Sequence, residues 1–545
     1  MAVALEPLVF DKFKGIREFN GVNAGGEISA LVCENVELVQ TEIGGTTGIK
    51  SMNGVTELYN LPTGYVVKGL FTSEQDNKVY ELIYAENTTA EKGRLYYINP
   101  TDDTVTLLID DLTVTGECNG VTMSSSAYDV FIFTNGEEAY SVCFTTDISY
   151  PYQTAEPINF TISDNTKTYK TDYEGNDIKF LAMAVWNGFL VVATDYGVRG
   201  SRDNDIYTWN DNPTDISKSW YINYTEKVTA LYAYTGGLFI FTDDNTDFLN
   251  TTPNNTAASL LQTTAGVGCH NYNSIVKHDT YLFFYSDIQK NIYMIQNIDN
   301  GQTRPTGPLA KEIQSAFKLV KDFKMYSCIY DNKNEIWCII TDLYGNVRVY
   351  IYNYFQGEWV MRKERENIGI NALCLIHNTI HTGNDNKIYC EFMNSLAGFY
   401  ASRYKTCFIN AGSNTNLKKQ KTPLLLVLND SYINDFWVQL TVNGKQKSEK
   451  HIKLSTGESG IYGSTGETLT VTPQNQKYGT SATSTKDCAL YGEYNNYSRK
   501  VVEVSTPQTW YTMSVEIKTK TNGEGFYICS MELKNMKAKL KTKGR

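Results

Sequence analysis

The chain has 545 residues, of which 41% are hydrophobic and 20% are charged, and its formal net charge is −11. This length predicts about three or four domains, although an all-β fold can run well past roughly 200 residues as one unit. The apolar content excludes a largely disordered protein. The acidic balance argues against a protein that coats nucleic acid over its whole surface, since phosphate binding needs clustered Lys and Arg. An acidic wall still suits a duct through which DNA slides without sticking.

The beginning of the chain does not look like an export signal, because Glu6 and Asp11 stand where such a signal would continue its apolar segment. No stretch approaches the roughly 18 consecutive apolar residues of a membrane span, so we expect a soluble protein with no membrane span. The 11 cysteines include no Cys-x-x-Cys pair. We therefore expect buried, reduced thiols rather than a zinc site.

One phrase repeats along the chain: a turn with Asn, Asp or Gly, a short apolar and β-branched run, a second polar turn, and a Tyr-rich segment. One copy reads YTGGLFIFTDDNTDFLN, at residues 234–250. The loosest copy starts at Gly69. The apolar runs of the others centre on Phe131, Phe189, Leu238, Leu282, Trp337 and Ile380.

Each copy predicts an antiparallel hairpin, since Asn-Gly and Gly-Gly favour tight turns and Tyr and Thr favour strands. A spacing of roughly 40 to 50 residues with about four strands is the period of a propeller blade. We therefore predict an all-β fold, a β-propeller of six or seven blades over residues 61–400, opened by an N-terminal or platform segment at 1–60. The other all-β arrangement, a row of sandwiches, would need repeats of about 100 residues.

One segment departs from this phrase. In residues 307–324, Leu309, Ile313, Phe317 and Val320 recur at helical intervals and Pro308 stands near the start. We predict one helix inserted between two blades. Packing on the propeller is favoured over docking to a neighbouring subunit.

The blade phrase stops near Tyr400. Residues 401–510 are polar, with short apolar runs such as TPLLLVL and FWVQLTV, and predict a small β-sandwich-like accessory insertion. Residues 511–545 alternate again and predict a closing hairpin around Asn522-Gly523, followed by a basic tail. That tail contains the candidate DNA or partner contacts Lys534, Lys537, Lys539, Lys541, Lys543 and Arg545. A solvated, frayed terminus is an equal alternative.

Residues with catalytic chemistry are sparse. Of the five histidines, His377 and His381 are four apart, but their segment predicts strand and turn rather than a helical metal site. The segment SRDNDIYTW (Ser201–Trp209) is similar to the Asp-box hairpin of sialidase-like propellers, but it occurs once and its turn Gly is replaced by Asp205. We assign no catalytic, cofactor or metal residue and expect no enzyme. A carbohydrate-binding propeller, suggested by Tyr- and Trp-rich segments, and a sialidase- or glycosidase-like enzyme remain as alternatives.

The order of several phrases resembles one family. CENVELVQTEIGGTTGIKSMNG (33–54), NGFLVVATDYGVRGSRDNDIYTW, GGLFIFTDDNTDFL, TYLFFYSDIQKNIYMI and VYIYNYFQGEWV follow one another as in the tail nozzle and packaged-DNA stabilisation (tail hub) proteins of short-tailed bacteriophages. Thr46-Thr47-Gly48 stands where that family usually has Arg-x-Gly. The resemblance covers residues 30–60 and most of 120–395, and residues 401–510 have no counterpart.

The resemblance implies a structural virion protein without catalytic residues, assembled in the host cytoplasm. It would form a ring, usually a hexamer, below the portal and adaptor of the capsid. Such a ring extends the DNA channel, helps to retain packaged double-stranded DNA, conducts it during ejection without sequence specificity, and contacts tail fibres or a terminal plug.

Overall fold

The computed structural model describes residues 2–539 apart from 6, 18–26, 42–45, 76, 100–102, 125–128, 145–155, 159–179, 195–196, 207–208, 210–218, 235, 254–257, 297–302, 331–332, 364–368, 392–400, 412–416, 421, 430–433, 455–498, 522–523 and 535. The chain folds into two units. The propeller unit comprises Thr56–Phe355 and Glu364–Glu391, and the sandwich unit comprises Met1–Val55, Gln356–Lys363 and Phe392–Arg545. Among the residues so described, no helix is both long and apolar enough to span a membrane.

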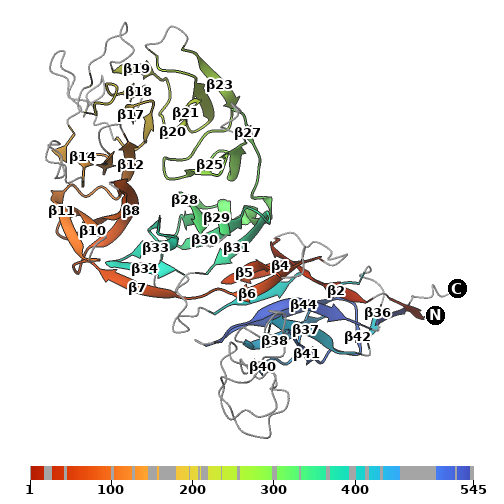
Figure 1. The fold of residues 1–545 in the computed structure, drawn as a ribbon. Coiled ribbons are helices and arrows are strands. Elements are labelled where there is room, and N and C mark those ends of the chain that lie inside the picture. The colour runs from red at the N-terminus through yellow and green to blue at the C-terminus, as the bar shows by residue number, and fades with distance from the viewer. Residues whose placement is uncertain are drawn as a thin grey trace, which may run out of the picture. The chain divides into compact units, whose positions relative to one another are not determined.

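The described part of the propeller unit contains six four-stranded antiparallel sheets, and three antiparallel strands of a larger sheet form a further blade (Figure 1). The predicted count of six or seven therefore resolves to seven blades. The first three are β8 (Val66–Gln75), β9 (Lys78–Asn87), β10 (Lys92–Ile98) and β11 (Val105–Leu112); β12 (Asn119–Ser124), β13 (Asp129–Thr134), β14 (Ala139–Val142) and β15 (Glu156–Pro157); and β16 (Met183–Trp186), β17 (Phe189–Thr194), β18 (Gly197–Gly200) and β19 (Trp220–Asn223). The next two are β20 (Ala230–Tyr234), β21 (Gly237–Phe241), β22 (Asn245–Leu249) and β23 (Leu260–Ala265); and β24 (Ile275–His278), β25 (Tyr281–Ser286), β26 (Asn291–Ile295) and β27 (Pro305–Thr306). The sixth contains β28 (Val320–Tyr330), β29 (Lys333–Asp342) and β30 (Val347–Asn353), and the seventh is β32 (Ala372–Ile376), β33 (Thr379–Asn384), β34 (Lys387–Glu391) and β7 (Val55–Asn60).

The repeated apolar run is the second strand of each blade. In β21, all five residues from Gly237 to Phe241 are buried, and β13, β25 and β29 are buried along almost their whole length. A second strand lies inside its own sheet and is covered on both faces by neighbouring blades, so both of its side-chain rows are apolar. This explains why the runs show little alternation in the sequence.

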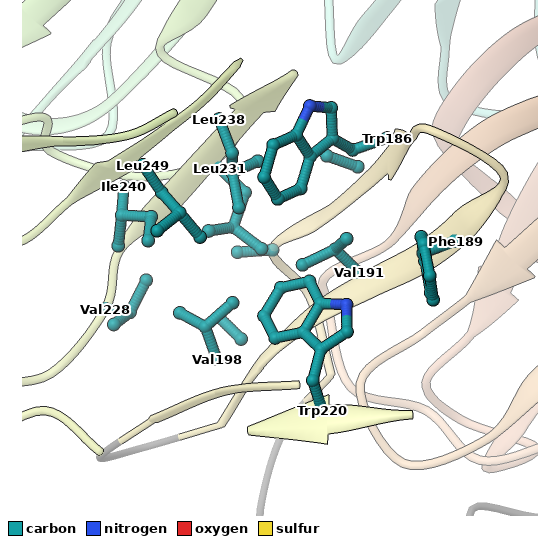
Figure 2. Close-up of a cluster of buried hydrophobic side chains, with 13 residues drawn as sticks. Trp186, Phe189, Val191, Val198, Trp220, Val228, Leu231, Leu238, Ile240 and Leu249 are labelled. Atoms are coloured by element: carbon teal, nitrogen blue, oxygen red, sulfur yellow. The ribbon is translucent and has the colours of Figure 1, made fainter. Parts of the chain in front are cut away.

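Neighbouring blades share apolar clusters. Between the third and fourth blades, Trp186 and Trp220 meet edge to face with ring centroids 6.1 Å apart, and they pack with Leu238 and Ile240 of β21 (Figure 2). Aromatic side chains bury much apolar area, and the edge-to-face geometry adds to the attraction. The blades are therefore held together mainly by these shared faces.

Chain segments far apart in sequence complete the seventh blade. β7 follows β34 in the strand order, so a strand near residue 55 completes a sheet whose other strands lie between 372 and 391. Leu61 N donates to Asn386 O at 2.8 Å, and the Lys387 ammonium pairs with the Glu57 carboxylate at 2.6 Å. The first and last blades also share an apolar cluster that includes Val67, Ile83 and Ile388. The ring is thus closed by hydrogen bonds and by burial.

The predicted helix over 307–324 is much shorter than expected. The structure contains a 3-10 helix η2 (Lys311–Phe317), whose backbone departs from helical angles at Ile313, and β28 already begins at Val320. Ile313 and Phe317 are fully buried, and the Phe317 ring stacks on Tyr285 at 5.5 Å. The apolar residues that are four apart require only that one face of the segment be buried, and a short helical turn is enough for this. The helix ends early because the chain must extend at Val320 to form the first strand of the next blade. The segment therefore packs on the propeller.

The sandwich unit contains two series of paired strands. In one, β44 (Tyr527–Leu533) lies between β37 (Leu424–Asn429) on one edge and β2 (Leu8–Phe10) and β6 (Thr47–Ser51) on the other; β41 (Arg499–Val504) and β5 (Val36–Gln40) extend it. In the other, the order is β40 (Lys450–Leu454), β38 (Asn434–Val442), β43 (Met513–Lys518), β35 (Arg403–Thr406) and β4 (Glu27–Glu34), with β3 (Lys12–Ile16) parallel to β4 and the short β39 (Lys445–Gln446) beside β38. β31 (Glu358–Arg362) also pairs with β4. Phe436, Val438 and Leu440 alternate as buried residues along β38, as a strand with one buried face requires.

These pairings differ from the predicted division at 60, 400 and 510. Residues 1–55 and 511–545 pair with strands of 401–510, so all three segments form one unit into which the propeller is inserted. The predicted closing hairpin is also not a simple one: β43 pairs with β35 and β38, whereas β44 pairs with β2, β6 and β37. Asn522 and Gly523 lie outside the described residues. Alternation along a strand predicts that it has a buried face, but not which strand pairs with it.

Trp220 gives a direct test of the shared faces. The Trp220→Ala substitution should lower the free energy of unfolding of the propeller unit by about 3–5 kcal/mol, because it removes a ring that is 2% exposed and leaves a cavity. Urea unfolding followed by intrinsic fluorescence measures this change. Leu107→Ala on the exposed outer strand β11 is the control and should stay within about 0.5 kcal/mol. Equal losses in the two variants would contradict the proposed packing.

Candidate functional sites

The Ser201–Trp209 segment forms a structural turn. The Ser201 hydroxyl oxygen accepts a hydrogen bond from Leu190 N at 3.0 Å, and Asn204 N donates to Gly188 O at 2.8 Å. Trp209 is buried, donates from its indole nitrogen to Ile206 O, and packs in the cluster shared by the second and third blades. These contacts hold the turn against the β16–β17 hairpin. Tyr207 and Thr208 lie outside the described residues.

The two neighbouring histidines have different environments. His377 lies in the turn between β32 and β33 with a positive φ of 45°. His381 lies on β33, with Cys374 of β32 and Cys390 of β34 as its partners in register. Its Nδ1 lies 2.8 Å from a carboxylate oxygen of Glu81, which comes from β9 of the first blade. The histidine pair is therefore not arranged as a metal site, and His381 instead joins the first and last blades.

The ion pair controls the charge of His381. Burial lowers the pKa of its imidazole, but hydrogen bonds to Cys390 and Glu81 and the negative charge of Glu81 more than offset this, and the pKa is raised to about 9. Glu81 and His381 are 4% and 7% exposed, so the two charges interact with little solvent screening. At neutral pH the imidazole is protonated and pairs with the carboxylate.

Asp435, His451 and Glu524 of the sandwich unit form the one described group of three side chains close enough to share an ion. The Asp435 carboxylate already pairs with Lys453 at 2.8 Å and with His451 at 2.6 Å. Burial raises the pKa of Asp435, but these hydrogen bonds outweigh burial and the net pKa is lowered. Glu524 accepts hydrogen bonds from Lys520 N and the Thr521 hydroxyl. These partners already compensate both carboxylates, so the group acts as an ion-pair network between β38, β40 and the segment before β44.

The prediction of buried thiols is confirmed for the ten cysteines in the described part of the chain, all of which are buried and free. Burial raises the pKa of the Cys118 thiol to about 12 and that of Cys269 to about 12, so both remain protonated at neutral pH. Thiols in this state are poor nucleophiles and poor metal ligands.

The basic tail begins as part of a small sheet. β45 (Met536–Lys539) lies between β1 (Ala2–Ala4) and β36 (Leu417–Gln420), with β42 (Thr509–Trp510) beside β36. Lys534 is exposed and pairs with Glu532 at 2.7 Å, and Lys537 is exposed on β45. Lys539 ends the strand, while Lys541, Lys543 and Arg545 lie outside the described residues. The tail is therefore an ordered strand as far as Lys539.

A further lysine, which the sequence analysis did not single out, lies opposite this strand. Exposed Lys419 of β36 is the direct partner of Lys537 in the antiparallel register. Neither ammonium group forms an ion pair with the residues that the structure describes. Like charges that lie directly opposite each other on paired strands repel. The only signal in the sequence was the pair Lys418-Lys419, and it does not reveal the partner strand.

Comparisons with known proteins bear on the fold alone. Neither a protein-family model nor a curated protein matches the chain. Virginiamycin B lyase from Staphylococcus aureus is similar over 62% of this chain and 99% of that chain, with 11% identity and a TM-score of 0.38. BamB from Moraxella catarrhalis is similar over 66% and 94%, with 10% identity and a TM-score of 0.33. The Pan2 WD40 domain from Neurospora crassa is similar over 63% and 97%, with 7% identity and a TM-score of 0.35. Likeness at this level carries no inference about activity.

The Glu81–His381 pair predicts a pH dependence of stability. The folded pKa of about 9 lies above the ordinary value near 6.5, so the pair stabilises the fold fully below about pH 6.5, and this contribution is lost as the pH rises through about 9. Glu81→Gln should therefore lower the free energy of unfolding by about 3–5 kcal/mol near pH 6 and by much less near pH 10. Urea unfolding across this range tests it. Glu57→Gln breaks the exposed pair with Lys387 and is the control, with a small, pH-independent effect expected.

The Lys419–Lys537 pair predicts a stabilising substitution. Lys537→Glu places a carboxylate opposite Lys419, so repulsion becomes attraction and the free energy of unfolding of the sandwich unit should rise by about 0.2–1 kcal/mol at low salt. The gain should shrink at high salt. Lys534→Glu is the matched control and should destabilise, because it replaces an ion pair with Glu532 by two like charges. Melting temperatures at two salt concentrations distinguish the two variants, and loss of stability in both would contradict the register.

Proposed function

We propose that the chain is a structural protein of a short-tailed phage tail, in which several copies form a ring that extends the DNA channel below the portal and adaptor. The observation that carries this proposal is the order of the five phrases that resemble the tail nozzle family. Four of them correspond to β5–β6, β17–β18, β21–β22 and β25–β26, and the fifth spans β30 and β31. Each phrase therefore lies on strands that follow one another along the chain.

The chemistry of the described side chains supports a structural role. The groups that most resemble sites in the sequence, Ser201 with its turn, His381 and Asp435, all have contacts that hold strands together. Other groups of the protein satisfy the hydrogen bonds of these side chains and pair with their charges. A protein whose work is mechanical needs such internal connections, because force on a tail channel is resisted by strand pairing and packing.

Exposed apolar side chains provide contact area for a ring. Leu343 and Tyr344, at the tip between β29 and β30, are 62% and 79% exposed, and Leu343 N donates to the carbonyl of the 45% exposed Leu319. A second exposed pair, Leu260 and Leu261, lies on the outer strand β23. A closed ring needs two different surfaces on each copy, so that one surface contacts the other on the next copy. Apolar groups at two places on the propeller unit supply such surfaces.

Charge supports the passage of DNA. A net charge of −11 on every copy gives a ring whose acidic surface repels the phosphate backbone and lets DNA move without tight contacts. The lysines of β45 and β36 would form a local basic collar in such a ring. They suit the DNA end or an acidic neighbouring ring protein, with an affinity that falls as salt rises.

The first experiment is the mass of the purified protein by light scattering, with negative-stain images of the same sample. We expect a ring of several copies with a central channel wide enough for duplex DNA. Leu343→Asp together with Tyr344→Asp should reduce the mass to that of a monomer with little change in melting temperature, because both side chains are exposed in the single chain. Leu343→Met with Tyr344→Phe keeps the apolar surface and should leave the ring intact.

Two results would count against the proposal. A protein that stays monomeric at its highest attainable concentration, alone and with the portal and adaptor of its phage, would remove the ring. A ring that survives both aspartate substitutions would move the subunit contact away from the Leu343–Tyr344 tip.

A further inference from the structure

The propeller unit contains a cavity of about 720 Å³ at the place where the first strands of several blades approach one another. β8 and β28 line it directly, and the segments leading into β12 and β24 complete it. All of its lining residues belong to the propeller unit. A volume of this size lies within the roughly 300–1,000 Å³ that small-molecule sites occupy. We call it the axial cavity.

Positive charge is concentrated in the axial cavity although the whole chain is acidic. Its lining includes Lys68 and Lys324, both half-buried, and the exposed Lys321. In the described structure, Lys324 Nζ donates to the Asn371 carbonyl at 2.9 Å, and no carboxylate is paired with Lys68 or Lys324. A carbonyl group satisfies a hydrogen bond but leaves the charge of the ammonium group uncompensated. The two half-buried lysines thus hold net positive charge at the cavity wall.

Two carboxylates, Asp322 and Glu117, also line the cavity, so its wall holds three lysines against two acidic side chains. Asp322 accepts hydrogen bonds from Asn271 Nδ2 at 3.2 Å and from Phe323 N at 2.9 Å, and Glu117 is exposed. Behind the wall, buried Glu86 accepts hydrogen bonds from Gly116 N and from the Tyr84 hydroxyl. These hydrogen bonds hold the loop that leads into β12, and the negative charge of Glu86 acts on the cavity-lining Cys118 from behind the wall.

Neutral hydrogen-bonding groups complete the wall. Tyr272, Tyr326 and Cys118 also line the cavity. Burial is the main cause that raises the pKa of all three side chains, so each keeps its proton at neutral pH. The positive charges of Lys324 and Lys68 partly oppose the shift of Cys118, which places both ammonium groups near this thiol. Ammonium, phenol and thiol groups at one cavity favour an acceptor-rich, negatively charged ligand.

We propose that the axial cavity binds a small anion bearing a phosphate or carboxylate group, with the ammonium groups of Lys68 and Lys324 as its main partners. The site goes beyond the channel function, because every residue that forms it belongs to one copy and no ring is required. A ligand bound across the first strands of several blades would stabilise the propeller, since it connects segments that otherwise meet only at their edges.

The test is binding of inorganic phosphate and of citrate to the full chain by isothermal titration calorimetry, with melting temperature as a second readout. Sodium chloride at equal ionic strength controls for screening, and glucose is the uncharged probe. We expect at least one of the two anions to bind and to raise the melting temperature above the chloride control, and glucose to have no effect. Phosphate alone would identify a phosphorylated ligand, and citrate alone a carboxylated one.

Lysine variants test whether the anion binds at Lys68 and Lys324. Lys68→Ala and Lys324→Ala should each weaken anion affinity by about tenfold or more, because each removes a charged hydrogen-bond donor. Lys68→Arg keeps the charge and should retain most of the affinity. Lys78→Ala is the matched control: it removes an exposed lysine of the same blade that does not line the cavity, and affinity should be unchanged.

Clear results would overturn this proposal. Anions that stabilise no more than chloride at equal ionic strength would mean that the cavity has no anion site. Anion affinity that is equal in the native chain and in Lys68→Ala would place the site elsewhere. Should Lys324→Ala fail to fold, because it also loses the hydrogen bond to Asn371, Lys68→Gln carries the test with a side chain of similar size and no charge.

Discussion

The propeller depends on one constraint: the second strand of each blade is buried on both faces, and in every blade except the last this strand is mainly apolar. A four-stranded sheet cannot cover such a strand by itself, so each blade is stable only between two neighbours. Leu238 and Ile240 of β21 face the tryptophans of the preceding blade, while Phe239 and Phe241 face the following one. A row of such sheets would leave an uncovered face at each end. Pairing of β7 with β34 closes the ring and removes both uncovered ends. The buried Glu81–His381 pair adds a contact between the same first and last blades.

Prediction from sequence succeeded where the determining contacts are local. The seven apolar runs and their turns indicated seven hairpins, because a turn and its two strands lie within about twenty residues of one another. Prediction failed where the same local spacing of apolar residues is compatible with two different structures. Ile313 and Phe317 need one buried face, and a single 3-10 turn before β28 provides it as well as a long helix would. The number of blades stayed open by one because β7 lies near residue 55 and its partner strand near residue 390.

Long-range pairing also limited what could be predicted about sites. The sequence placed His381 in a strand, but its partner Glu81 lies 300 residues earlier, and no local pattern connects them. Lys419 faces Lys537 only because β36 pairs with β45, and the segments that bring Lys68 and Lys324 together belong to different blades. The SRDNDIYTW turn was recognised because the hydrogen bonds of Ser201 and Trp209 join residues that are close in sequence.

The position of β7 also determines the order of events during synthesis. The contact between Glu57 and Lys387 spans 330 residues, so the strand that completes the last blade leaves the ribosome long before its partners exist. At the usual elongation rates of about 5–20 residues per second, this interval is roughly 20–60 s. During that time the nascent chain carries several finished blades with an uncovered apolar face and a free strand edge, which is the state most prone to pair with another chain. That face and that edge stay open to other chains until residue 391 has been added.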